Sequence, residues 1–152
     1  MRIVIGADHA GYELKKHLIL PLETLGHEVV DAGAHGLNPD DDYPDFAHAV
    51  SEPVATRKAD RGVIVCGSGV GASVAANKIK GVRASVCHDT YSARQGVEHD
   101  DMNVLCLGAR IVGGGLAKEI VEAFACAEFT GEIRHLRRLE KVLAIEAASS
   151  EA

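Results

Sequence analysis

The stretch Gly62-Val63-Ile64-Val65-Cys66-Gly67-Ser68-Gly69-Val70-Gly71 joins a short apolar run to a glycine-rich loop. The apolar run predicts a buried strand, and Ala72-Ser73-Val74-Ala75-Ala76 after the loop predicts a helix. The pattern therefore predicts a strand–loop–helix unit with the Cys66 thiol at the end of the strand. Free N–H groups in such a loop favour an anion, either the thiolate itself or a developing oxyanion of a substrate. The other interpretation is a buried core cysteine whose glycines only let helix and sheet pack closely.

Strand and helix patterns alternate on both sides of this unit. We predict strands over residues 2–7, 27–31, 61–66, 82–87 and 103–107, helices over 12–25, 44–59, 70–79, 90–98 and 115–127, and an extra C-terminal helix over 133–147. Such alternation predicts an α/β fold, a three-layer doubly wound sandwich around a five-stranded parallel sheet. We expect one domain over residues 1–152 with strand order 2-1-3-4-5. The ligand-binding switch point would then lie between the first and third strands.

Composition narrows the class of protein. Hydrophobic residues make up 47% of the 152 residues but aromatic residues only 4%, which predicts an aliphatic core like that of a parallel sheet covered by helices. The net charge of −6 argues against nucleic acid as a partner. The chain has no apolar stretch long enough to span a bilayer, and it enters a strand without a signal peptide. We therefore expect a cytoplasmic protein with no membrane partner.

The cysteines and acidic residues give no sign of a metal or cofactor site. No C-x-x-C pair occurs, and we interpret Cys87, Cys106 and Cys126 as small core residues rather than disulfide or metal partners. The run Asp40-Asp41-Asp42 is predicted to be a polar loop, because three consecutive carboxylates do not converge on a metal without other ligands. The glycine loop matches neither a nucleotide triphosphate loop nor a dinucleotide fingerprint. We expect no metal and no cofactor.

Several ionisable residues are predicted to meet at the switch point. Asp8 and His9 follow the first strand and Cys66 ends the third, so the carboxyl ends of neighbouring strands bring them into one crevice. Asp8 could simply cap the next helix, but a cap does not explain an imidazole at the switch point, and we favour contact with a substrate. Ser68 does not form a serine hydrolase elbow, because Cys66 replaces the first glycine of G-x-S-x-G.

A second set of candidates belongs to other parts of the chain. His99 precedes the fifth strand, at the amino ends of the strands, so a catalytic His99 would act on a neighbouring subunit; the alternative is a surface histidine in an acidic loop. Arg134 and Arg138 share a helical face and could clamp a phosphate, although a solvated basic face explains their spacing equally well. Arg110 follows the fifth strand on the switch-point side and could add a third cation.

Short motifs are spread in order over nearly the whole chain. They are Gly6-x-Asp8-His9-x-Gly11, Asp42-Tyr43-Pro44, Cys66-Gly67-Ser68-Gly69-Val70-Gly71, Ala75-Ala76-Asn77-Lys78, Tyr91-Ser92-Ala93, His99, Asn103-Val104-Leu105, Gly108-Ala109-Arg110, and Arg134-His135 with Arg138. Together they resemble the type B ribose-5-phosphate isomerases, in the wider family that includes the galactose-6-phosphate isomerase subunits.

The resemblance implies a role for each matching residue. Cys66 would be the base that moves a proton between C1 and C2, His99 would assist ring opening, and Ser68 would handle protons on the substrate oxygens. One branch of the family has a glutamate base at the position of Ala72, which alanine cannot replace. The remaining implied contacts are the amides of Gly67, Ser68, Gly69, Val70 and Gly71 to the enediolate oxygen, Asp8, His9 and Tyr43 to the sugar, and Arg110, Arg134 and Arg138 to the phosphate.

The resemblance also implies a homodimer with shared active sites, which could pair into a tetramer, and a small-molecule sugar phosphate as substrate. We expect an aldose–ketose isomerase that converts ribose 5-phosphate to ribulose 5-phosphate by metal-free enediolate proton transfer. Asp100 stands where many relatives have asparagine, and an ionised aspartate can only accept hydrogen bonds from a sugar. The alternatives are therefore an isomerase of a tetrulose 4-phosphate or a hexose 6-phosphate, or a non-catalytic phosphosugar-binding subunit.

Overall fold

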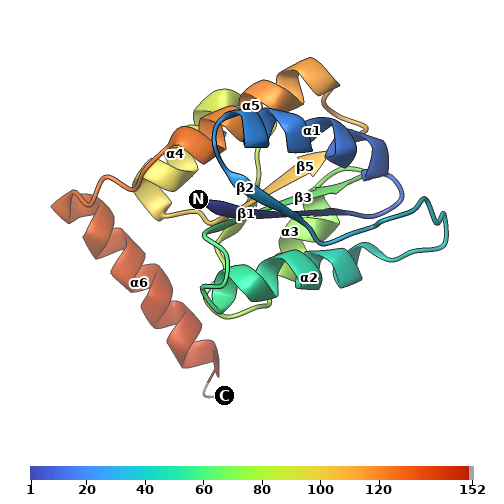
Figure 1. Ribbon diagram of the computed structural model, residues 1–152. Helices are drawn as coiled ribbons and strands as arrows, with labels where there is room; N and C mark the ends of the chain where they lie inside the picture. Colours follow the sequence, from blue (N-terminus) through green and yellow to red (C-terminus); the bar gives the residue numbers. More distant parts are fainter. Residues whose placement is uncertain (151–152) are drawn as a thin grey trace.

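The computed structural model describes residues 1–150, and its strands and helices alternate as predicted (Figure 1). The strands are β1 (Arg2–Ala7), β2 (Glu28–Asp31), β3 (Arg61–Cys66), β4 (Ala84–Val86) and β5 (Val104–Gly108). The helices are α1 (Tyr12–Thr24), α2 (Tyr43–Ala55), α3 (Val70–Ala76), α4 (Thr90–Asp100), α5 (Gly114–Cys126) and α6 (Ile133–Ser150). The helix predicted over 70–79 ends early because the Asn77 amide bonds the backbone N–H and C=O of Ala84 at 2.9 and 2.8 Å.

The five strands form one parallel sheet in the order β2-β1-β3-β5-β4. The predicted order 2-1-3-4-5 is therefore wrong for the last two strands. All five residues of β5 are buried, as suits an interior strand, whereas β4 has three residues with Ser85 exposed, as suits an edge. The exchange places Cys66, at the end of β3, in register with Gly108 at the end of β5.

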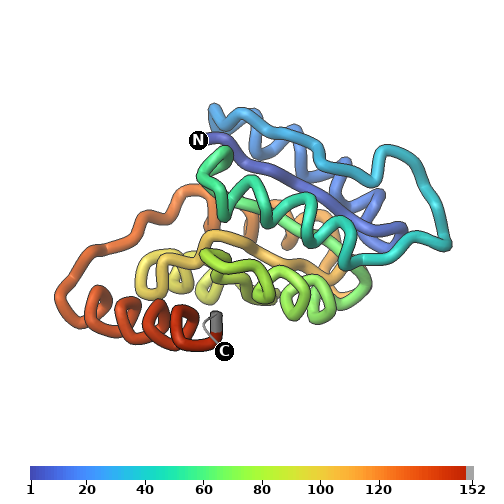
Figure 2. The backbone as a smooth tube through the Cα atoms, turned by 90° about the horizontal axis from the view of Figure 1, so that it is seen from below, coloured from blue at the N-terminus to red at the C-terminus, as the bar shows by residue number. Residues whose placement is uncertain are grey.

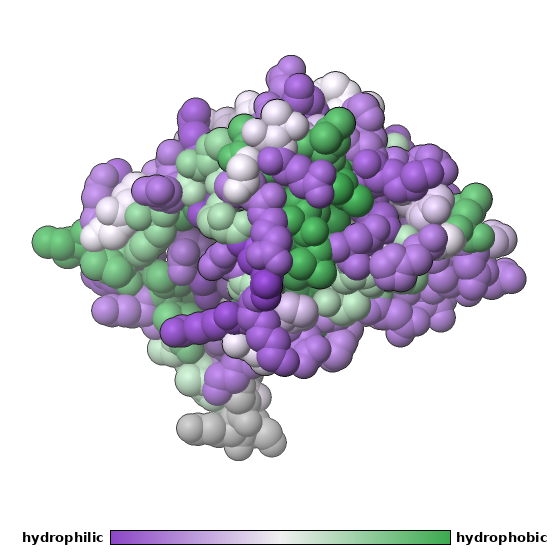
Figure 3. Space-filling view, viewed as in Figure 1, coloured by the Kyte–Doolittle hydropathy of each residue, from purple (hydrophilic) through white to green (hydrophobic). Residues whose placement is uncertain are grey.

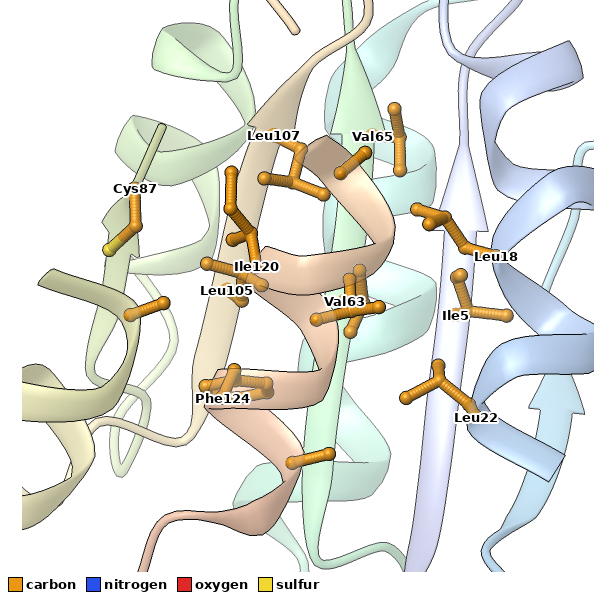
Figure 4. Close-up of a cluster of buried hydrophobic side chains, with 14 of the residues drawn as sticks. Ile5, Leu18, Leu22, Val63, Val65, Cys87, Leu105, Leu107, Ile120 and Phe124 are labelled. Carbon is orange, nitrogen blue, oxygen red and sulfur yellow. The ribbon is translucent and has the colours of Figure 1, made fainter. Parts of the chain in front are cut away.

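Helices cover both faces of the sheet, which confirms the three layers. On one face α1, α4 and α5 pack on alternate strand residues, and on the other face α2 and α3 pack on the residues between them. Figure 4 shows the first face, where Leu18 and Leu22 of α1 and Ile120 and Phe124 of α5 lie over the strands. The core is aliphatic as expected; among residues 1–150, Phe124 is the buried aromatic hydrocarbon side chain.

The entry into α1 lies very close to β3. A Cβ atom on Gly11 would lie 2.2 Å from the carbonyl oxygen of Val65, so only glycine fits there. This contact brings the segment that follows β1, with Asp8 and His9, against the carboxyl end of β3. The switch point between β1 and β3 is thus a tightly packed junction of two strand ends.

Helix α6 lies outside the three layers in both Figure 1 and Figure 2. Its first turn is anchored, because His135 is 1% exposed, stacks on His99 with ring centroids 4.0 Å apart, and bonds Thr130 Oγ1 through Nδ1 at 2.5 Å. The segment that leads from α5 into α6 is held as well, because Arg61, at the start of β3, donates to the carbonyls of Phe124 and Ala127 at the end of α5.

The rest of α6 exposes hydrophobic side chains. Ile133 is 85% and Ile145 71% exposed, and Figure 3 shows hydrophobic surface where α6 begins. A cavity of about 470 Å³ separates part of α6 from the end of α2 and the start of β4. In the part of the chain that the structure describes, no helix is both long and apolar enough to cross a membrane.

Candidate active site

A cavity of about 300 Å³ lies at the carboxyl ends of β1, β3 and β5. The residues that line it are Asp8, Tyr43, Cys66, Gly67, Ser68, Gly71, Arg110 and Ile111. Seven of these eight are candidates from the sequence, and Ile111 is the addition. The order β3-β5 explains the grouping, since Arg110 leaves the sheet two residues after Gly108, the register partner of Cys66.

Cys66 is held in the wall of this cavity by its own loop. Its side chain is buried, and the Gly69 N–H donates to Sγ at 3.1 Å. Gly69 adopts a left-handed conformation, with φ of 81°, that turns its amide back toward the strand end. A backbone N–H directed at sulfur stabilises negative charge on it. The loop thus directs a hydrogen-bond donor at the sulfur beside the cavity.

The other loop amides are only partly free for a substrate. The Val70 N–H donates to Ser68 Oγ at 3.2 Å, which leaves the Ser68 hydroxyl proton available to an oxygen in the cavity. The Gly69 amide is engaged by Cys66, and neither Gly69 nor Val70 lines the cavity. Of the predicted loop contacts, Gly67, Ser68 and Gly71 lie at the cavity wall.

The lack of a side chain at Gly71 leaves room for the ring of Tyr43. A Cβ atom there would lie 2.7 Å from the ring of Tyr43, which begins α2 and reaches across to the first turn of α3. Because Gly71 is a glycine, the Tyr43 ring can pack against its backbone at the cavity.

Arg110 supplies positive charge to the cavity. A Cβ atom on Gly67 would lie 3.4 Å from an Arg110 guanidinium nitrogen, so the cation lies against the glycine loop. Within residues 1–150 the Arg110 side chain has no carboxylate or carbonyl partner. An unpaired guanidinium beside a thiol favours an anionic substrate group such as a phosphate.

Asp8 and His9 are placed differently. Asp8 is buried at the cavity wall and accepts from the Gly11 N–H at 3.1 Å. Gly11 is the N-cap residue of α1 and has no side-chain cap, so the alternative that Asp8 caps this helix is wrong. His9 is not among the cavity-lining residues; its Nδ1 lies 2.7 Å from Asp41 Oδ1, and its backbone N–H donates to the same oxygen at 2.9 Å. The hydrogen bond to Asp41 raises the pKa of His9 against the opposing effect of burial, and the charge of Asp8 adds to the rise.

Asp41 was missed as a site residue, because the acidic run was interpreted as a simple polar loop. It is 32 residues from His9 in sequence, and no local spacing signals the contact. One ligand atom each from Asp8, His9 and Asp41 lie within 4.8 Å of one another, a distance compatible with a bound cation. The Nδ1–Oδ1 separation of 2.7 Å is that of a hydrogen bond between the two side chains.

The structure does not bring the other candidates, His99, Asp100, Arg134 and Arg138, to this cavity. His99 lies in the last turn of α4, at the opposite edge of the sheet, with Nδ1 3.1 Å from the Gln95 amide nitrogen. Arg134 and Arg138 are exposed on α6, and Arg134 pairs with Glu132 at 3.0 Å. Asp100 lines a separate cavity of about 270 Å³ between β4 and α4.

The other cysteines differ from Cys66 in their surroundings. Burial raises the pKa of the Cys87 thiol and that of the Cys106 thiol, so both stay protonated at neutral pH. Both are buried as predicted, but Cys126, the last residue of α5, is exposed, and its prediction as a core residue is wrong. Its position at the helix end turns it away from the sheet.

Comparison with known proteins gives the family. The family described as Ribose/Galactose Isomerase matches residues 3–142. The chain is 44% identical to ribose-5-phosphate isomerase B of Escherichia coli, over 95% of this chain and 96% of that protein. It is 38% identical to D-erythrulose-4-phosphate isomerase 2 of Mycolicibacterium smegmatis, over 97% of this chain and 99% of that protein.

The fold agrees with the sequence comparison. The solved structure of ribose-5-phosphate isomerase B of Clostridium thermocellum superimposes with a TM-score of 0.93 at 48% identity, covering 98% of this chain and 99% of that chain. The similarity in sequence and in fold thus extends over almost the full length of both chains. The chain therefore belongs to the ribose/galactose isomerase family and is an enzyme of the sugar-phosphate isomerase class.

Proposed function

We propose that the enzyme interconverts ribose 5-phosphate and ribulose 5-phosphate, with Cys66 as the base and without a metal ion. The observation that carries this proposal is the placement of the Cys66 sulfur, which receives the Gly69 N–H at 3.1 Å and shares one cavity with the unpaired Arg110. A proton-accepting group next to an anion-binding group is what isomerisation of a sugar phosphate needs. The relatives named ribose-5-phosphate isomerase B support the five-carbon sugar.

The reaction follows as three proton transfers. The Cys66 thiolate takes the proton from C2 of the open-chain aldose, and the C–H electron pair forms the C1–C2 double bond while the carbonyl oxygen on C1 becomes an oxyanion. The Cys66 thiol then returns the proton to C1, and the hydroxyl proton on O2 moves to O1. Ser68, whose hydroxyl proton is free, is suited to carry the oxygen-bound proton. No hydride moves, so the step needs no Lewis acid.

A homodimer with shared sites completes this proposal. The cavity of one chain holds a base and one cation, whereas His99, Arg134 and Arg138 lie at the other edge of the sheet or on α6. Val70, Val74 and Ile111, next to the cavity, are 56%, 58% and 59% exposed, which suits an apolar contact with a second copy. A second chain that covers this surface would add a ring-opening histidine and two phosphate-binding arginines.

The substrate is tested by steady-state kinetics with four-, five- and six-carbon sugar phosphates, together with exchange of the C2 proton in deuterated water. We expect the highest kcat/KM for ribose 5-phosphate, by at least about tenfold over the others. Activity should survive prolonged treatment with a chelator. Activity that is lost to the chelator and regained with zinc or manganese would contradict the metal-free route.

The second candidate substrate is a tetrulose 4-phosphate. It is favoured by the name of the Mycolicibacterium smegmatis relative and by Asp100, which can only accept a hydrogen bond from a sugar. A 4-phosphorylated tetrose cannot close a five-membered ring, so its isomerisation needs no ring-opening group. His99→Ala should therefore reduce turnover of ribose 5-phosphate strongly and leave turnover of a tetrose phosphate nearly intact. A higher kcat/KM for the tetrose phosphate in the unaltered enzyme would assign that substrate instead.

A further inference from the structure

The loop between β2 and α2 carries a carboxylate onto the histidine that follows β1. Asp41 Oδ1 lies 2.7 Å from His9 Nδ1 and accepts the His9 backbone N–H at 2.9 Å. The Asp41 side chain is 10% exposed and that of His9 34% exposed. Two hydrogen bonds from one residue to one oxygen fix both the backbone and the ring of His9 with respect to Asp41.

Within the part of the chain that the structure describes, the charge of Asp41 has no ion-pair partner other than His9. Its second oxygen, Oδ2, is buried without a hydrogen bond, and among residues 1–150 no lysine or arginine pairs with this carboxylate. A nearly buried carboxylate favours a positive charge on the group that it touches. Here that group is the His9 ring, so Asp41 favours the imidazolium form.

The other charges around His9 act in both directions. The Asp8 carboxylate also raises the pKa of His9, while the Arg110 cation and burial lower it, and the hydrogen bond from Asp41 is the largest of these effects. Asp8 and Arg110 both line the catalytic cavity, so His9 lies at its margin. With Nδ1 engaged by Asp41, the remaining ring N–H at Nε2 has no partner within residues 1–150.

We propose that Asp41 is a positioning residue for His9: it holds the imidazolium by Nδ1 and leaves the Nε2–H to donate to an oxygen of the sugar phosphate. The assignment of the donor to a sugar phosphate rests on the proposed function, but the contact between the two side chains does not. The competing account is that Asp41 only ties its loop to the backbone of His9. The two accounts differ in whether the carboxylate charge acts through the ring.

The first test needs no substrate. The titration of the His9 ring is followed by NMR in the unaltered enzyme, in Asp41→Asn, and in the control Asp40→Asn, which alters the neighbouring exposed acid; His9→Gln assigns the resonance. We expect the pKa of His9 to fall in Asp41→Asn and to stay unchanged in Asp40→Asn. Asp41→Glu keeps the charge and should preserve the raised pKa even if the loop is disturbed. An unchanged His9 titration in Asp41→Asn would overturn the proposal.

The second test is kinetic. Asp41→Asn should raise KM for ribose 5-phosphate about tenfold with kcat changed by less than about twofold. The double variant His9→Gln with Asp41→Asn should be no worse than His9→Gln alone, because Asp41 acts through the ring. Additive losses, or an equal rise of KM in Asp40→Asn, would favour the purely structural account. If another sugar proves to be the substrate, the NMR result still stands, so the two failures can be told apart.

Discussion

The carboxyl and amino ends of the parallel strands, called here the carboxyl edge and the amino edge of the sheet, carry the same kinds of side chain but arrange them differently. At the carboxyl edge, Asp8, Cys66 and Arg110 surround a cavity of about 300 Å³. At the amino edge, the His99 and His135 rings stack on each other, and the Nδ1 atom of each is directed to a protein partner, Gln95 and Thr130 respectively. In the proposed dimer, the carboxyl edge of one chain would receive the substrate, and the amino edge of the other chain, with α6, would present a histidine and arginines to it.

The largest expected effect breaks the carboxyl edge. Cys66→Ala should lower kcat and C2 proton exchange about 10³-fold, because it removes the base while leaving Arg110 in the cavity. Binding of the sugar phosphate, measured by calorimetry, should change little. Cys126→Ser, at an exposed cysteine far from the cavity, is the matched control and should keep full activity. Near-normal turnover by Cys66→Ala would remove this cysteine from the mechanism.

The next experiment asks whether the two edges work together across molecules. Cys66→Ala and His99→Ala chains, each nearly inactive alone on ribose 5-phosphate, are mixed and allowed to exchange. Random exchange makes half of the dimers mixed, each with one intact site of two, so the mixture should regain about a quarter of the unaltered activity. Mass spectrometry of the intact dimers verifies the exchange. Mixed dimers without activity would place His99 outside a shared site.

A smaller effect is expected at the contact between Gly71 and the Tyr43 ring. Gly71→Ala places a methyl group 2.7 Å from the Tyr43 ring, which must move away from the cavity, and we expect KM to rise about tenfold. Gly115→Ala, where an added Cβ meets nothing within 4 Å, is the control and should leave KM unchanged. If Gly71→Ala lowers kcat but not KM, the residue acts through its amide rather than through Tyr43.

The smallest effect concerns the amino edge at acid pH. Burial, and next the charge of His99, lower the pKa of His135 in the folded chain. The unfolded histidine, with a pKa near about 6.5, then binds protons more readily than the folded one, so stability is full above that pH and falls as pH decreases through it. His135→Gln should therefore show a flatter decline of Tm between pH 7.5 and 5.5 than the unaltered enzyme. His48→Gln, at an exposed histidine of α2, should show the same decline as the unaltered enzyme.

From the sequence, the strands and helices were predicted more reliably than the order of the strands within the sheet. The alternation of strands and helices was confirmed, because it follows from periodicity along the chain, but the positions of β4 and β5 were exchanged. The contrast between the fully apolar Val104-Leu105-Cys106-Leu107 and the short Ala84-Ser85-Val86 could have signalled which of the two strands is interior.

The cavity residues, too, were predicted where the local sequence marks them and missed where only the folded chain brings them together. Asp8 and Cys66 were expected together because each ends a strand at the switch point. Asp41 and Ile111 were missed because loop conformation brings them to their positions, and nothing in their own neighbourhood marks them. The roles of the residues remain predictions that the variants above address.

The hydrogen bonds that Arg61 makes have a consequence for the proposed association of two chains. By holding the carbonyls of Phe124 and Ala127, Arg61 gives the segment that leads into α6 a fixed point of departure, and the buried His135 fixes the first turn of the helix. A protruding helix that is held in this way has few orientations to lose when another chain covers it. In the proposed dimer, association would then carry a small penalty in conformational entropy, and the Arg61 guanidinium would contribute to the affinity between copies.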